Sequence, residues 1–204
     1  MIGWLKDRLF QKTAFTLDDD PRWKAFNNAD HPCSCCGQSF NGIFDIGFDH
    51  PSQWPHQNRQ ASGEDILKVG DEYLSSDLCV VEDGQFVRGV LYIPVIGSDE
   101  PFGFGVWCSL HTDTFEIYAK NFRDRSDTPI EGAFGWMCNA LPYYDTEDPL
   151  PSDVLFSSGN KRPLIELHDG KHPLVEAQRN GITFDTLLDI YKASGTDIRP
   201  HLER

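Results

Sequence analysis

The sequence predicts an α+β fold with an antiparallel-rich central sheet and flanking helices. Two patterns indicate this: strand-like segments follow one another through short turns in the middle of the chain, and helical patterns lie on either side of them. With 204 residues, the chain suits one domain. We expect residues 1–30 to form an N-terminal helical extension and residues 31–204 a single α+β domain.

The N-terminal extension is expected to hold two helical segments. Ile2, Leu5 and Leu9 fall on one face of a helix. Three consecutive aspartates then break the pattern, and Pro21 suits the first turn of a second, short helix. Because the polar face beside Trp4 lacks a Lys/Arg cluster, docking of this segment on the core is favoured over membrane anchoring.

The central sheet is predicted from alternation and turn signals. Asp83 and Gly84 form a two-residue hairpin signal between two apolar segments. From Phe102 to Leu110 apolar residues occupy every second position, so their side chains share one buried face. The predicted strands are residues 78–82, 85–95, 102–110, 134–141, 154–156 and 164–167.

Three further helices are predicted beside these strands. Asp113 and Glu116 have the spacing of a capping box at the start of the first helix. Pro173 fits the first turn of the second helix, and Gly181 ends it. Thr183 is placed to cap the last helix.

The net charge of −14, from 32 acidic and 18 basic residues, bears on the partners of the protein. An acidic surface repels nucleic-acid phosphates and anionic membranes, because binding to both depends on Lys and Arg. We therefore expect no nucleic-acid partner and no membrane partner, whereas a basic protein partner is physically favoured. The alternative is that the acidity serves solubility alone.

The expected compartment is the cytoplasm. Charges interrupt the apolar residues at the start of the chain, unlike a secretory signal. The longest apolar stretch, residues 89–97, is too short to span a bilayer. In the cytoplasm the six cysteines stay reduced unless they bind a metal.

The most compact candidate site is the sequence HPCSCCG at residues 31–37. Cys33 and Cys36 are separated by two residues and followed directly by Gly37. Two thiolates at this spacing can bind one zinc ion, and the glycine relieves the tight turn. A structural zinc site needs four ligands, and a second C-x-x-C pair is missing. Candidates for the other ligands are His50 with His56, His168 with His172, or Cys35 and His31.

Two other interpretations of these cysteines stay open. A redox dithiol has the same spacing, but its first cysteine normally begins a helix, which Gly37 does not favour. Alternatively the cysteines are ordinary small packing residues. Cys79, Cys108 and Cys138 lie far apart in strand-like apolar segments, which suits packing.

A second candidate site lies in the predicted strand at residues 102–110, on the face opposite Phe102 and Phe104. Gly103 and Gly105 alternate there with Trp107, and the missing side chains leave a trough beside the indole ring. A helix packed into this trough is the favoured interpretation. The alternative is a ligand groove in which Trp107 is a stacking or anchor residue.

Charged residues provide the remaining binding candidates. Arg88 lies in an apolar strand, so its charge needs a partner, and Asp77 or Glu166 would form a structural ion pair with it. A guanidinium that lines a groove is the alternative. Arg162, Glu166 and His172 form a His/Glu/Arg cluster in the sequence, although His172 is also placed to cap the helix that follows.

Several segments, in this order, resemble a bacterial family known as domain of unknown function 2199. They are CSCCG at residues 33–37, DLCV at 77–80, FVRGVLYIPV at 86–95, FGVWCSL at 104–110, FGW at 134–136, RPLIEL at 162–167, HPLV at 172–175 and QRNGI at 178–182. The resemblance covers roughly residues 33–191 and leaves out the first thirty.

The resemblance implies that the candidate residues belong to family motifs, and it brings no activity with it. In the family pattern a histidine follows the C-x-x-C-G motif by three residues, and this chain has Phe40 there. If that histidine is a ligand in relatives, this chain lacks it. The residues placed in motifs are Cys33, Cys36, Arg88, Trp107, Arg162, Glu166 and His172.

Three functional hypotheses follow. The leading one is a non-catalytic cytoplasmic binding module, with zinc holding the loop of Cys33 and a basic protein, such as a toxin, as its partner. The second is an enzyme that uses His172, Glu166 and Arg162 beside a Trp107-lined groove, although no G-x-S-x-G elbow, P-loop or H-E-x-x-H motif is present. The third is a thiol-redox protein.

Overall fold

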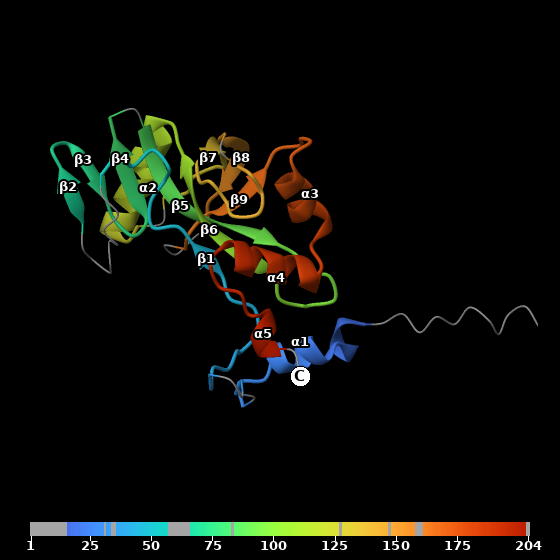
Figure 1. Ribbon diagram of the computed structural model, residues 1–204. Helices are drawn as coiled ribbons and strands as arrows, with labels where there is room; N and C mark the ends of the chain where they lie inside the picture. The colour runs from blue at the N-terminus through green and yellow to red at the C-terminus, as the bar shows by residue number, and fades with distance from the viewer. Residues whose placement is uncertain are drawn as a thin grey trace, which may run out of the picture.

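Five strands at the centre of the protein close into a barrel (Figure 1). Their order around the ring is β6-β7-β8-β9-β5, and β5 pairs back onto β6. They are β5 (Gly84–Ile93), β6 (Phe102–Ser109), β7 (Ala133–Met137), β8 (Leu150–Leu155) and β9 (Leu164–Leu167). The structure is a computed structural model, and it describes residues 16–30, 32–33, 36–56, 66–82, 84–126, 128–146, 148–157 and 161–202.

Four shorter strands extend the barrel into a nine-stranded sheet. Strands β4 (Leu78–Val81), β3 (Glu72–Leu74) and β2 (Leu67–Val69) continue antiparallel from β5. Strand β1 (Ile46–Gly47) pairs in parallel with β6. The predicted α+β class and the antiparallel majority are confirmed, and the closure of five strands into a barrel is a feature that the prediction did not include.

Glycines explain why the sheet closes. A Cβ atom at Gly89 of β5 would lie 2.6 Å from the Ile165 side chain of β9. A Cβ atom at Gly135 of β7 would overlap the Ser109 carbonyl of β6. Glycine at both positions lets neighbouring backbones approach closely, as a narrow barrel requires.

The barrel is a packed core, not a channel. Most of its interior side chains are buried, and they join a main core that continues under the helices. The interior residues include Val87, Val106, Cys108, Met137, Val154 and Ile165. A smaller cluster on the outer face of β4, β5 and β6 holds Trp54, Leu74, Cys79, Val81, Phe86, Trp107 and Cys138.

The helices pack their apolar faces on the main core. Helix α2 (Thr112–Asp124) contributes Phe115 and Tyr118, and α4 (Phe184–Ala193) contributes Leu187 and Tyr191. Helix α3 (Pro173–Asn180) lies against β5 and β9. The predicted starts of α3 and α4 and the end of α3 at Gly181 are confirmed.

The predicted capping box at Asp113 and Glu116 is wrong. Helix α2 begins at Thr112, two residues earlier than that box requires, and His111 is its N-cap residue. The His111 ring accepts a hydrogen bond from the Asp113 N–H at 3.4 Å, so the imidazole fills the role that was assigned to a carboxylate.

The two ends of the described chain pack side by side. The short helix α1 (Pro21–Phe26), preceded by the 3-10 turn η1 (Leu17–Asp19), lies beside α5 (Arg199–Leu202) (Figure 1). Trp23 and Phe26 of α1 place their rings 5.0 and 5.6 Å from that of Phe184. Residues 1–15 lie outside the described residues, so the first predicted helix and the division at residue 30 stay predictions. No described helix is long and apolar enough to cross a bilayer.

Candidate metal centre

Three side chains with metal-binding atoms meet beside α1 and α5. The ligand atoms of Cys33, Cys36 and His201 all lie within 4.8 Å of one another. The Nδ1 atom of His201 is 3.3 Å from the Cys33 Sγ atom and 3.4 Å from the Cys36 Sγ atom. Cys33 is buried, Cys36 is exposed and His201 is intermediate, so the group opens to solvent on one side.

These distances fit a zinc ion. With Zn–S bonds of about 2.3 Å and a Zn–N bond of about 2.0 Å, tetrahedral geometry places sulfur and nitrogen about 3.5 Å apart. The two observed distances are close to that value. Two thiolates and one imidazole are also a donor set that zinc prefers over harder cations such as magnesium or calcium.

The backbone of the cysteine turn brings the two thiols together. The Gly37 N–H donates to the Cys33 carbonyl at 2.7 Å, and the Cys33 N–H donates to the Gln38 carbonyl at 2.8 Å. These bonds reverse the chain so that both sulfurs lie on one side. Gly37 has a φ of +74°, a conformation that other residues rarely adopt.

Helix α5 is anchored on both sides of His201 in the sequence. Its neighbour Leu202 and the preceding Ile198 are buried in the main core. The Arg199 guanidinium donates to the Asp189 carboxylate at 2.6 Å, which ties α5 to α4. The ring of Phe40 lies 6.1 Å from that of His201.

The histidines proposed from the sequence lie elsewhere. His56 pairs with Glu72 at 2.5 Å, and His168 pairs with Asp153 at 2.9 Å. His50 contacts the Pro51 carbonyl at 2.8 Å. Cys35 and His31 lie outside the described residues. Sequence reasoning missed His201, because a single histidine 168 positions from Cys33 carries no spacing signal.

The other described cysteines are packing residues, as their apolar segments indicated. Cys79, Cys108 and Cys138 are buried. Burial raises the pKa of the Cys79 thiol to about 12 and that of Cys138 to about 11, and it raises the pKa of Cys108 further. These thiols stay protonated near neutral pH, and a protonated thiol is a poor nucleophile.

Trp107 does not line an open groove. Its side chain is fully buried in the smaller cluster, and its indole N–H donates to the Phe48 carbonyl at 2.9 Å. The segment that includes β1 fills the trough at Gly103 and Gly105, where a helix was expected to pack. The Asp45 carboxylate lies against Gly103 and accepts its N–H at 2.9 Å, while Gly47 lies against Gly105.

The His/Glu/Arg cluster is not assembled around Trp107. His172 is the N-cap of α3, and its Nδ1 atom accepts from the Leu174 N–H at 3.1 Å. Glu166 is exposed on β9. The geometry that the enzyme hypothesis required is therefore not present among these residues.

Arg88 and Arg162 are close to each other but differ in their partners. Arg162 pairs with Asp77 at 2.6 Å. The Arg88 guanidinium lies against Gly47, and its Nε atom has no hydrogen-bond partner among the described residues. Burial lowers the pKa of Arg88, and the Arg162 charge lowers it further, whereas Asp77 and Asp49 oppose this shift. The predicted ion pair of Arg88 with Asp77 or Glu166 is therefore not found among the described residues, and Asp77 pairs with Arg162 instead.

One family model matches residues 32–182, and its description is an uncharacterized protein conserved in bacteria. No curated protein and no solved structure matches the chain. The matched region includes both cysteines of the candidate metal centre and ends before His201. Because the match spans well over half of the sequence, this chain belongs to the bacterial family designated domain of unknown function 2199.

Proposed function

We propose that the protein is a binding module in which one zinc ion joins the cysteine turn to helix α5. The observation that carries this is the spacing of the His201 Nδ1 atom at 3.3 and 3.4 Å from two sulfurs. The fourth ligand would be water, or Cys35 or His31, which neighbour the described ligands in sequence. The zinc would have a structural role, because it connects segments that are 168 positions apart.

Metal analysis of purified protein tests this proposal. After expression with added zinc, we expect about one equivalent of zinc per chain, and less than about a tenth of an equivalent would overturn the metal centre. Cys33→Ser and Cys36→Ser should each lose the metal. His168→Ala is a matched control, because His168 lies on the surface and pairs with Asp153, and it should retain the metal.

Cobalt replacement tests the ligand set. Thiolate–cobalt charge-transfer bands report how many sulfurs bind, and the visible bands report whether the site is tetrahedral. The protein should show a tetrahedral spectrum with at least two thiolates. Cys35→Ser and His31→Ala then distinguish the fourth ligand, since only the variant that removes a ligand changes the spectrum. An octahedral spectrum without thiolate bands would contradict the proposed site.

The charge of −14 supports a basic protein as the partner of this module. Affinity capture from the native cell at low ionic strength should enrich a protein of positive net charge. Titration of the purified pair should then give an affinity that falls as salt rises, because exposed charges are screened. Recovery of only neutral or acidic proteins would count against this part of the proposal.

A further inference from the structure

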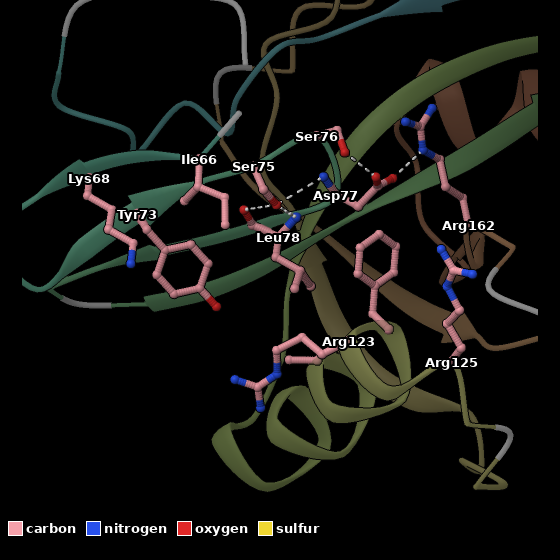
Figure 2. Close-up of a pocket in the computed structure, with 12 residues that line it drawn as sticks. Ile66, Lys68, Tyr73, Ser75, Ser76, Asp77, Leu78, Arg123, Arg125 and Arg162 are labelled. Atoms are coloured by element: carbon pink, nitrogen blue, oxygen red, sulfur yellow. Dashed lines mark hydrogen bonds and ion pairs between the residues drawn. The ribbon is translucent and has the colours of Figure 1, made fainter. Parts of the chain in front are cut away.

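A cleft of about 880 Å³ opens between helix α2 and strands β2–β4 (Figure 2). It is separate from the metal centre, since the two share no residue. Its size lies within the range of about 300–1,000 Å³ that is typical of small-molecule sites. The cleft is therefore large enough for a ligand of that class.

The charge of the cleft is opposite to that of the protein. Four cationic side chains line it, in a chain that has 18 Lys and Arg against 32 acidic residues. The one acidic lining residue, Asp77, is paired with Arg162. Within the described part of the chain, Lys68, Arg123 and Arg125 have no carboxylate at ion-pair distance. As far as the described residues extend, these three cations are available to a ligand.

The body of the cleft is apolar. Leu78 and Ala119 are buried, and the partly buried rings of Tyr73 and Phe122 add aromatic surface. Burial raises the pKa of Tyr73, while the charge of Arg123 opposes this shift, so the guanidinium acts on the phenol. A ligand here would contact apolar and aromatic surface as well as cationic groups.

The cations are distributed around this apolar surface. In Figure 2, Lys68 lies at one end of the cleft and Arg125 and Arg162 at the other, with Arg123 on the helix below. Arg125 ends α2 with a φ of 52°, a left-handed conformation that is uncommon for a residue other than glycine. Arg125, the residue with this conformation, lines the cleft.

We propose that this cleft binds a small organic anion with an aromatic body. Ionised guanidinium groups form strong hydrogen bonds with sulfonate, phosphate or carboxylate oxygens. Aromatic surface and nearby guanidinium groups would hold a planar ring by stacking. The proposal does not depend on the zinc site, because neither set of residues contributes to the other.

The test uses two dyes that share an aromatic body and differ in charge. The full-length protein should bind the anion 8-anilinonaphthalene-1-sulfonate more tightly than neutral N-phenyl-1-naphthylamine. Arg123→Gln and Arg125→Gln should each weaken binding of the sulfonate about fivefold to tenfold. They should change binding of the neutral dye less than about twofold. Raising the salt concentration should weaken binding of the sulfonate alone.

Lys120→Gln is the matched control, because Lys120 is exposed on the same helix and does not line the cleft. It should change the affinity for the sulfonate less than about twofold. Near-ultraviolet circular dichroism should be the same in all variants, which excludes dye binding to loosened protein. Equal weakening in Lys120→Gln and Arg123→Gln, equal affinity for the two dyes, or no binding of the sulfonate would each overturn the proposal.

Discussion

The candidate metal centre and the cationic cleft are built by different physical rules. In the metal centre, two sulfurs and one nitrogen are brought together within 4.8 Å, and a glycine with positive φ directly follows the second cysteine. In the cleft, four long side chains from strand β2, the end of helix α2 and the segment before β9 surround an apolar surface. Metal coordination is short-range and directional, so two ligands that are close in the chain, such as Cys33 and Cys36, leave a spacing motif in the sequence. Attraction of an anion is long-range, so it leaves none.

The largest expected effect is loss of the metal in His201→Ala. We expect the zinc content to fall to less than a tenth of an equivalent. If free zinc is present at about 100 times its dissociation constant, loss of zinc binding lowers the free energy of unfolding by about 2.7 kcal/mol. For a chain of this size, that corresponds to a decrease of about 5–10 °C in melting temperature. Dye binding in the cleft should be unchanged. Loss of dye binding together with zinc would show that the two regions are coupled and would contradict their independence.

The next effect concerns Asp77→Asn, which removes the one carboxylate of the cleft. The pair with Arg162 is partly exposed, so we expect a loss of only about 1–2 kcal/mol in the free energy of unfolding. The same change removes a negative charge, so the sulfonate dye should bind about two to five times more tightly. Denaturant unfolding and dye titration measure the two effects. Weaker dye binding in a stably folded variant would contradict the assigned role of charge.

A smaller effect is expected for Gly37→Ala in the cysteine turn. Gly37 has open space around its Cα, so the cost arises from its φ of +74° alone and should be about 1 kcal/mol. Zinc affinity should fall, because the turn no longer holds both sulfurs. Gly170→Ala is the control, since an added Cβ there meets only the His168 carbonyl at 3.8 Å. Equal unfolding curves for the two variants would show that the turn is not strained.

The smallest effect is a shift in the titration of Tyr73. Burial raises its pKa and the positive charge of Arg123 lowers it. Because that charge favours the phenolate, Arg123→Gln should raise the pKa of Tyr73. Nuclear magnetic resonance of ring-labelled tyrosine can measure this. An unchanged or lowered pKa would place Arg123 away from the phenol and weaken the case for the cleft.

Sequence patterns predicted the parts of the fold that depend on local order. Alternation located β6, and β9 was predicted with its observed bounds. Strands β1, β2 and β3 were missed because two or three residues carry no periodicity. The start of β8 was missed because Pro151 lies inside it. Closure of the barrel depends on which backbones approach Gly89 and Gly135, and local periodicity does not specify that.

The same distinction between local sequence order and tertiary structure applies to the residues of the candidate sites. Cys33 and Cys36 were identified because their spacing reflects the coordination geometry. His201, Lys68, Arg123 and Arg125 were missed because tertiary structure alone brings them to their partners, whereas Arg162 was among the predicted binding residues. Trp107 and His172 were proposed for binding, whereas the fold uses them as a buried indole and a helix cap. Residue type alone does not separate those roles.

The separation of Cys33 from His201 has a mechanical consequence. The barrel strands all lie between these two residues in the chain. With zinc bound, a force applied to the two ends of the polypeptide would load the metal–ligand bonds first, and the hydrogen bonds of the enclosed strands would carry no tension. In single-molecule stretching, the bound ion should therefore act as a lock: the enclosed segment should lengthen only after a zinc–sulfur or zinc–nitrogen bond ruptures.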